Sequence, residues 1–128
     1  IQGLQLVRGS EQRAILFMLK LEIRLNAEQI SEGGKHTPEV LYGMLIRAFQ
    51  KEQIDYSEKP DETVLFVGRG CTKDYACFGK LITALRNQSW FMEYVERWIW
   101  YNSDDGEDEN DFVVEDVLLH YTNRTSIE

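Results

Sequence analysis

Cysteine is scarce in this sequence, which holds two, at positions 71 and 77. Six residues along a helix turn through about 600°, so the side chains of Cys71 and Cys77 would lie on different faces. We therefore predict neither a disulfide nor a zinc site, and interpret both thiols as reduced packing residues.

Long hydrophobic runs are absent. No stretch approaches the roughly 18 apolar residues that a membrane-spanning helix needs. Residues 1–8 also lack the basic, then apolar, then small-residue pattern of an export signal. These two absences predict a cytoplasmic protein that does not bind a membrane.

Residues with catalytic potential are few. The chain has two histidines, His36 and His120, and no G-x-S-x-G, H-E-x-x-H or C-x-x-C motif. Its glycine turn, in "VLFVGRGCTK" at 64–73, has Lys73 where the dinucleotide-binding fingerprint needs a third glycine, and it lacks the Walker spacing. We predict a protein that is not an enzyme, with no catalytic residue and no cofactor.

Basic residues are outnumbered by acidic ones, 14 to 22, and the excess acids are concentrated in one place. Residues 104–116 hold eight acids and no Lys or Arg, whereas the other 115 residues hold 14 of each sign. The whole net charge of -8 therefore comes from this stretch. Direct binding of nucleic acid is disfavoured, because it needs a basic surface, and a cationic partner is favoured.

Calcium is the first ligand to consider for the acidic stretch "NSDDGEDENDFVVED", because hard cations take carboxylate oxygens. When Gly106 is aligned with the invariant glycine of an EF-hand loop, Tyr101 occupies the first ligand position and Phe112 the last. Neither side chain can bind the ion there. We predict no metal site, and keep a metal-dependent hydrolase as an alternative that the acids alone leave open.

The aromatic segment "SWFMEYVERWIWYN", at 89–102, directly precedes the acids. Projected as a helix, most of its apolar residues fill an arc of about 200°, while Trp100 falls at about 280°, among the charged residues. Trp100 is either covered by a neighbouring loop or partly exposed beside the acids, where it would act as an aromatic anchor for a partner.

Local patterns predict a compact all-α bundle of about five helices in a single domain spanning 1–128. Ser10 could cap a helix over 11–30, although alternating apolar residues there also fit a strand. Four further helices are predicted, at 38–49 (capped by Thr37), at about 73–86, at 90–101 (capped by Ser89) and at 112–121 (capped by Asp111). The acidic segment, 102–111, would join the last two. The alternative is an α+β fold with a small sheet from residues 15–25 and 63–67.

The predicted partner-binding residues are the aromatic residues nearest the acids and the acids themselves: Trp100, Tyr101, Asp104, Asp105, Glu107, Asp108, Glu109 and Asp111. Eight like charges within 13 residues repel one another, so a folded chain that keeps them is expected to use them toward a cationic partner.

In small size, acidity and the pairing of "WFMEYVERWIWYN" with "SDDGEDEND", the chain resembles the immunity proteins of bacterial contact-dependent growth inhibition and related polymorphic toxin systems. The resemblance implies a cognate toxin domain as partner, with a tRNA nuclease as the expected class, whose basic active-site cleft a monomer would occlude in a 1:1 complex. A phage-type anti-defence inhibitor that imitates DNA is an alternative, although its acids would be expected along an extended face.

Overall fold

The computed structural model describes residues 17–104, 106–108 and 110–124. Asp105 and Glu109 of the predicted binding set lie outside the described residues. So does the first part of the helix predicted at 11–30.

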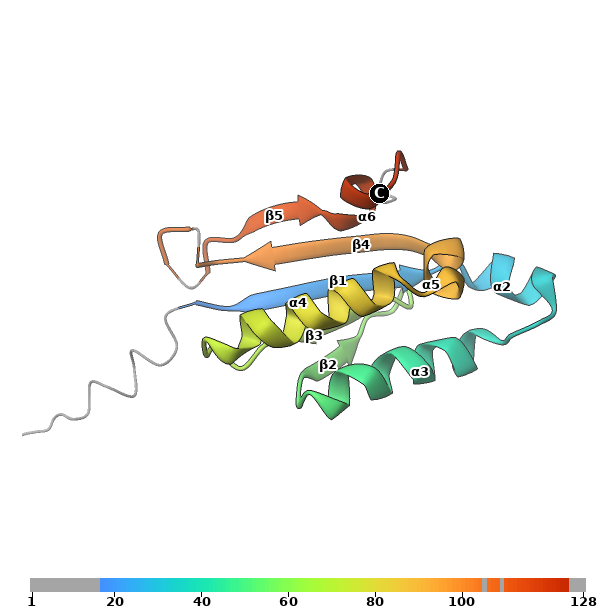
Figure 1. Ribbon diagram of the computed structural model, residues 1–128, viewed down its shortest axis with the longest axis horizontal. Helices are drawn as coiled ribbons and strands as arrows, with labels where there is room; N and C mark the ends of the chain where they lie inside the picture. Colours follow the sequence, from blue (N-terminus) through green and yellow to red (C-terminus); the bar gives the residue numbers. More distant parts are fainter. Residues whose placement is uncertain (1–16, 105, 109, 125–128) are drawn as a thin grey trace, which may run out of the picture.

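One antiparallel sheet organises the described chain, with its strands in the order β2-β3-β1-β4-β5 (Figure 1). The strands are β1 (Leu19–Leu25), β2 (Asp55–Glu58), β3 (Val64–Val67), β4 (Val95–Asn102) and β5 (Val113–Asp116). The helices are α2 (Ala27–Gly33), α3 (Pro38–Lys51), α4 (Lys73–Arg86), α5 (Ser89–Tyr94) and α6 (Val117–Tyr121). None of the helices in the described ranges is long and apolar enough to cross a membrane.

The predicted all-α bundle is wrong, and the α+β alternative has the right class. Its two segments hold β1 and β3, but the sheet takes three further strands that it did not include. The helix predicted over 11–30 is β1 followed by α2 where it is described. The alternating residues Leu19, Leu21, Ile23 and Leu25 all face the core. Their burial, together with the pairing of β1 with β3 and β4, outweighs the helix propensity of the intervening residues.

The helix predicted at 90–101 is also wrong, because only α5 is helical and the chain continues as β4. β4 pairs with β1 along its length, from Leu19 opposite Asn102 to Leu25 opposite Val95. In this strand Trp98 and Trp100 share one face, while Ile99 and Tyr101 share the other. Residues 98–101 are apolar at every position, so this run satisfies the helical and the strand period alike, and the pairing with β1 decides between them.

The last predicted helix, 112–121, divides into β5 and the short α6. Its cap is Asp116, whose Oδ1 accepts the Leu119 N–H at 3.0 Å, and not Asp111. The acidic segment therefore joins two antiparallel strands as a hairpin loop, instead of joining two helices.

The helix predicted at 38–49 is confirmed as α3. Thr37 Oγ1 accepts the Val40 N–H at 3.3 Å, and Pro38 occupies the first turn, as their types indicate. The helix predicted near 73–86 is confirmed as α4.

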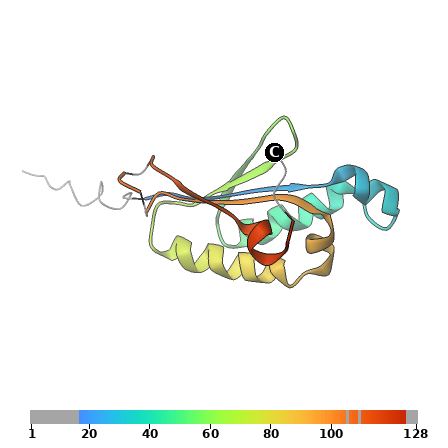
Figure 2. The same cartoon turned by 90° about the horizontal axis from the view of Figure 1, so that it is seen from above.

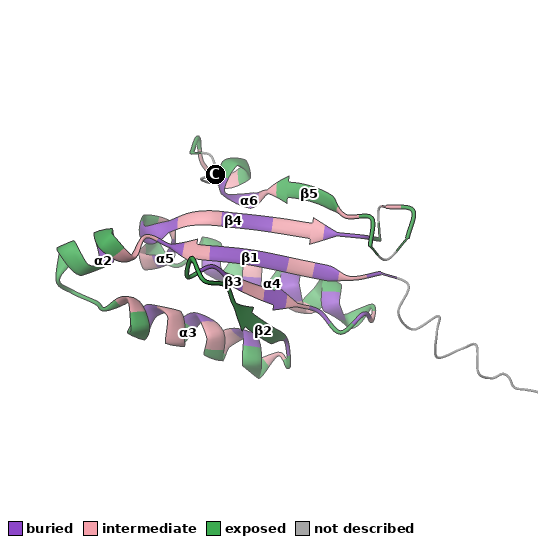
Figure 3. Ribbon diagram, turned by 180° about the vertical axis from the view of Figure 1, so that it is seen from behind, coloured by how far each residue is buried: buried purple, intermediate pink, exposed green. Residues whose placement is uncertain are grey.

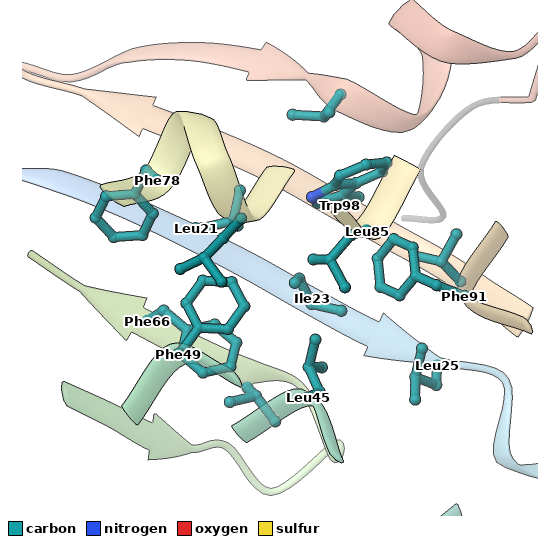
Figure 4. Packing of buried hydrophobic residues seen from close by; sticks show 14 of the residues in the cluster. Leu21, Ile23, Leu25, Leu45, Phe49, Phe66, Phe78, Leu85, Phe91 and Trp98 are labelled. Atoms are coloured by element: carbon teal, nitrogen blue, oxygen red, sulfur yellow. The ribbon is translucent and has the colours of Figure 1, made fainter. Parts of the chain in front are cut away.

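The core lies on one face of the sheet, under α3, α4 and α5 (Figure 4). Phe49 of α3 stacks on Phe66 of β3 with 3.7 Å between ring centroids, and Phe91 of α5 meets Trp98 of β4 edge-on. Figure 2 shows α4 along one side of the sheet and the β2–β3 turn rising on the other. None of the described helices covers the opposite face (Figure 3).

The glycine turn between β3 and α4 has a structural explanation. A Cβ on Gly68 would lie 2.6 Å from Asp74 Oδ2, and Gly70 has a φ of 82°. The buried Asp74 accepts the N–H groups of Gly70 and Cys71 at 2.8 and 3.2 Å. The space that a phosphate would need is therefore filled by a carboxylate.

Candidate protein-binding site

The candidate site is the hairpin loop between β4 and β5, at the end of the sheet where β1 begins (Figure 1). The acids that give the chain its net charge lie in this loop and in β5. Among the described members of the predicted set, the acids Asp104, Glu107, Asp108 and Asp111 are all exposed.

The base of the hairpin is anchored to the fold on two sides. Ser103 Oγ accepts the Met18 N–H at 2.7 Å, and the Ser103 N–H donates to the Met18 carbonyl at 3.1 Å. On the other side, the Tyr75 hydroxyl of α4 donates to Asp104 Oδ2 at 2.7 Å and accepts from Asn102 Nδ2 at 3.2 Å. The acidic loop thus starts from a fixed position.

Two acids shape the loop itself. Asp111 Oδ2 accepts the Glu107 N–H at 2.9 Å, and Asp108 Oδ1 accepts the Asn110 N–H at 2.8 Å. A Cβ on Gly106 would lie 1.8 Å from the Asp111 carbonyl oxygen, so only glycine fits there. These contacts hold the described part of the loop in a defined conformation despite the repulsion between its charges.

Trp100 and Tyr101 do not lie on the same surface, because adjacent residues of a strand face opposite sides of the sheet. Trp100 is half-buried on the helical face, where it meets Phe78 of α4 edge-on with centroids 5.3 Å apart. A helix, not a loop, covers it. Tyr101 lies on the face without helices.

Tyr101 belongs to a buried ionic network that sequence reasoning missed. Glu22 of β1 is 3% exposed, and its Oε1 accepts the Tyr101 hydroxyl at 2.7 Å and Arg97 Nη2 at 2.9 Å. Its Oε2 pairs with Lys59 from the β2–β3 turn. No local signal identifies this set, since its partners are 37 to 79 residues from Glu22 in sequence.

The network sets the charges of its members. Burial opposes ionisation of Glu22, but the hydrogen bonds from Lys59, Tyr101 and Arg97 together hold its pKa below the usual 4.5. Burial raises the pKa of Tyr101, and the carboxylate of Glu22 raises it further. At neutral pH Glu22 is therefore an anion that binds a neutral phenol and two cations.

The aromatic residue beside the acids is Phe112, which sequence reasoning placed in a helix. Its ring meets that of Tyr101 edge-on at 6.2 Å, and Lys20 Nζ lies 4.7 Å above it. Phe112 is half-buried at the end of the acidic loop, so it ties the loop to the helix-free face of the sheet.

β5, which follows, forms an edge of the sheet. Val113 and Val114 are 48% and 57% exposed. An edge strand offers unpaired backbone groups to another chain. The described site therefore combines anionic carboxylates with apolar side chains and a strand edge.

In residues 17–104, 106–108 and 110–124, no three His, Cys, Asp or Glu side chains are grouped closely enough to hold an ion.

No protein-family model matches the chain, and neither a curated protein nor a solved structure matches it. A proposal of function therefore rests on the chemistry of the site.

Proposed function

We propose that this protein binds and neutralises a basic protein, as the immunity proteins that it resembles neutralise their cognate toxin domains. The observation that carries the proposal is the anchored acidic hairpin: its charge is concentrated at one end of the sheet and its conformation is set by Tyr75, Ser103, Asp108 and Asp111. A solvated linker has no need of such anchoring.

A nuclease that acts on RNA is the partner class that fits best. Such an enzyme carries Lys and Arg around its cleft to hold phosphates, and carboxylates in a fixed loop can occupy the same positions. The exposed valines of β5 and the half-buried Phe112 supply apolar contact beside the charges. The proposed complex is 1:1 and forms in the cytoplasm, and this role requires no catalytic residue.

Neutralising Asp105, Glu107 and Glu109 tests the proposal and leaves Asp108 and Asp111, whose carboxylates accept backbone N–H groups of the loop, unchanged. We expect D105N/E107Q/E109Q to slow association with the basic domain encoded beside this gene about tenfold or more at low salt, because the long-range attraction is weakened. Stopped-flow mixing at several salt concentrations measures the rate.

The matched control is E28Q/E32Q/E93Q, which removes the same charge from exposed positions of α2 and α5, outside the hairpin. An equal slowing in this control would assign the effect to net charge alone. If no basic domain encoded beside the gene binds tightly, the proposal fails.

A further inference from the structure

A second surface feature lies outside the hairpin, in a groove of about 420 Å³ between α3 and the β2–β3 turn. The groove and the hairpin are at opposite ends of the sheet, since Val64 pairs with Ile23 near the end of β1 while Asn102 pairs with Leu19 at its start (Figure 1).

The floor of the groove is apolar and contains an unexpected glycine. Tyr42, Gly43 and Ile46 of α3 line it together with Val64 of β3. Gly43 lies inside a 14-residue helix, where glycine costs about 1 kcal/mol relative to alanine. A Cβ there would approach only the mobile end of Arg47, at 3.3 Å, so packing within the chain does not require glycine. What glycine provides is space in the groove.

The rim of the groove is anionic. Glu39, Glu58 and Glu62 line it, all three are exposed, and none forms an ion pair within the described residues. The cation in the lining, Lys59, has its ammonium group on Glu22.

Glu62 is the second residue of the groove whose local conformation is unfavourable for its residue type. Its φ is 71°, which lies in a region of backbone conformation that residues other than glycine and asparagine rarely adopt. Burial raises the pKa of the nearby Tyr42, and the charge of Glu62 raises it further. Two residues of one groove, Gly43 and Glu62, thus depart from what local stability favours, and such departures concentrate at binding sites.

We propose that this groove binds an arginine side chain presented by a partner protein. The aliphatic stem lies on Gly43, Ile46 and Val64, and the guanidinium group reaches the free carboxylates of the rim. Arginine fits better than lysine, because its planar group has five donors to share among several carboxylates and is more weakly hydrated. This site does not depend on the function proposed for the hairpin.

The direct test is an NMR titration of the ¹⁵N-labelled chain with the peptide acetyl-Leu-Arg-Leu-amide. We expect saturable shifts of the Gly43, Ile46 and Val64 amides, with a dissociation constant on the order of 1–10 mM for a single side chain. The analogue with citrulline in place of arginine has the same shape without the charge, and should shift these amides at least fivefold less. No saturable shift by about 20 mM, equal shifts with citrulline, or shifts centred on the hairpin would each overturn the proposal.

Variants separate the groove from general acidity. Gly43→Leu fills the groove and should abolish the shifts, whereas Gly43→Ala tests whether a small side chain is tolerated by the fold. E58Q/E62Q should weaken peptide binding at least threefold, and E28Q/E32Q, on α2, should leave it unchanged. If Gly43→Leu does not fold, the glutamate pair decides: unchanged binding in E58Q/E62Q would contradict the proposal.

Discussion

The Glu22 carboxylate is the centre of the buried ionic network on one face of the sheet. Glu22 lies on the face that none of the described helices covers, yet its side chain is 4% exposed because Lys59, Arg97 and Tyr101 enclose it. Removing one member of such a set leaves the others without their partner, which costs more than the net value of the interaction.

We expect Glu22→Gln to lower the free energy of unfolding by about 2 kcal/mol at pH 7, since Lys59 and Arg97 are partly exposed and water compensates in part for the lost pairing. The folded pKa of Glu22 lies below 4.5, so its contribution is present above pH 4.5 and is lost as the pH falls through the folded value. The difference between the two proteins should therefore shrink below pH 4.5, because protonated Glu resembles Gln.

Urea denaturation at a series of pH values from 7 to 3 measures this difference. The control Glu93→Gln changes an exposed carboxylate of α5 and should have little effect. A constant difference at all these pH values would show that Glu22 acts through packing and not through its charge.

At the scale of elements, the β4–β5 hairpin depends on contacts made at its base. Its acids repel one another, and the hydrogen bond from Tyr75 of α4 to Asp104 opposes that repulsion at the point where the loop begins. The hairpin is therefore coupled to α4 as well as to β1.

Tyr75→Phe should loosen the hairpin while leaving the fold intact, because it removes the hydroxyl but keeps the ring beside Phe17. We expect faster hydrogen exchange across residues 103–111, unchanged exchange in β1, and a loss of no more than about 1 kcal/mol in global stability. Hydrogen exchange followed by mass spectrometry resolves these segments. Tyr56→Phe on β2 is the matched control, and an equal effect there would assign the change to lost hydroxyls in general.

The predictability of elements from sequence also differs at this scale. α3 was predictable because its cap, Thr37, and its apolar stripe lie within the element itself. β4 was not, because the run Trp98, Ile99, Trp100 and Tyr101 contains no polar position to mark a period. Its conformation is determined by pairing with β1, which is distant in sequence.

The candidate site was predictable in the same uneven way. The acids could be located by counting. The placement of Trp100 and Tyr101 on opposite faces of the sheet could not, because it follows from the strand conformation of β4. The placement of Phe112 beside Tyr101 required the hairpin connection. Asp105-Gly106 is a dipeptide typical of two-residue hairpin turns, but the connection runs from Ser103 to Phe112, so this local signal does not predict it.

At the scale of the whole molecule, the sheet has two edges, β2 and β5, and every residue of β2 is exposed. Exposed edges invite association with another sheet. Both carry acids, Asp55 and Glu58 on β2 and Glu115 and Asp116 on β5, so two copies meeting edge to edge bring like charges together.

We expect the protein to be a monomer at pH 7, and D55T/E115T to self-associate, because threonine favours strands and the repulsion at both edges falls. Sedimentation velocity at about 10 to 100 µM measures the change. E32T/E93T removes the same number of charges and adds two threonines at exposed helical positions, and should remain monomeric. A monomeric D55T/E115T would show that charge is not what keeps the edges apart.

The sequence by itself determined where the charge lies and where α3 begins, because charges can be counted and the Thr37 cap acts over three residues. Only the tertiary structure decided that residues 95–102 form a strand, that Trp100 packs under α4, and that Glu22 gathers Lys59, Arg97 and Tyr101. These outcomes depend on contacts between segments far apart in the chain. Burial and strand pairing there outweigh the differences of less than about 1 kcal/mol per residue that local propensity supplies.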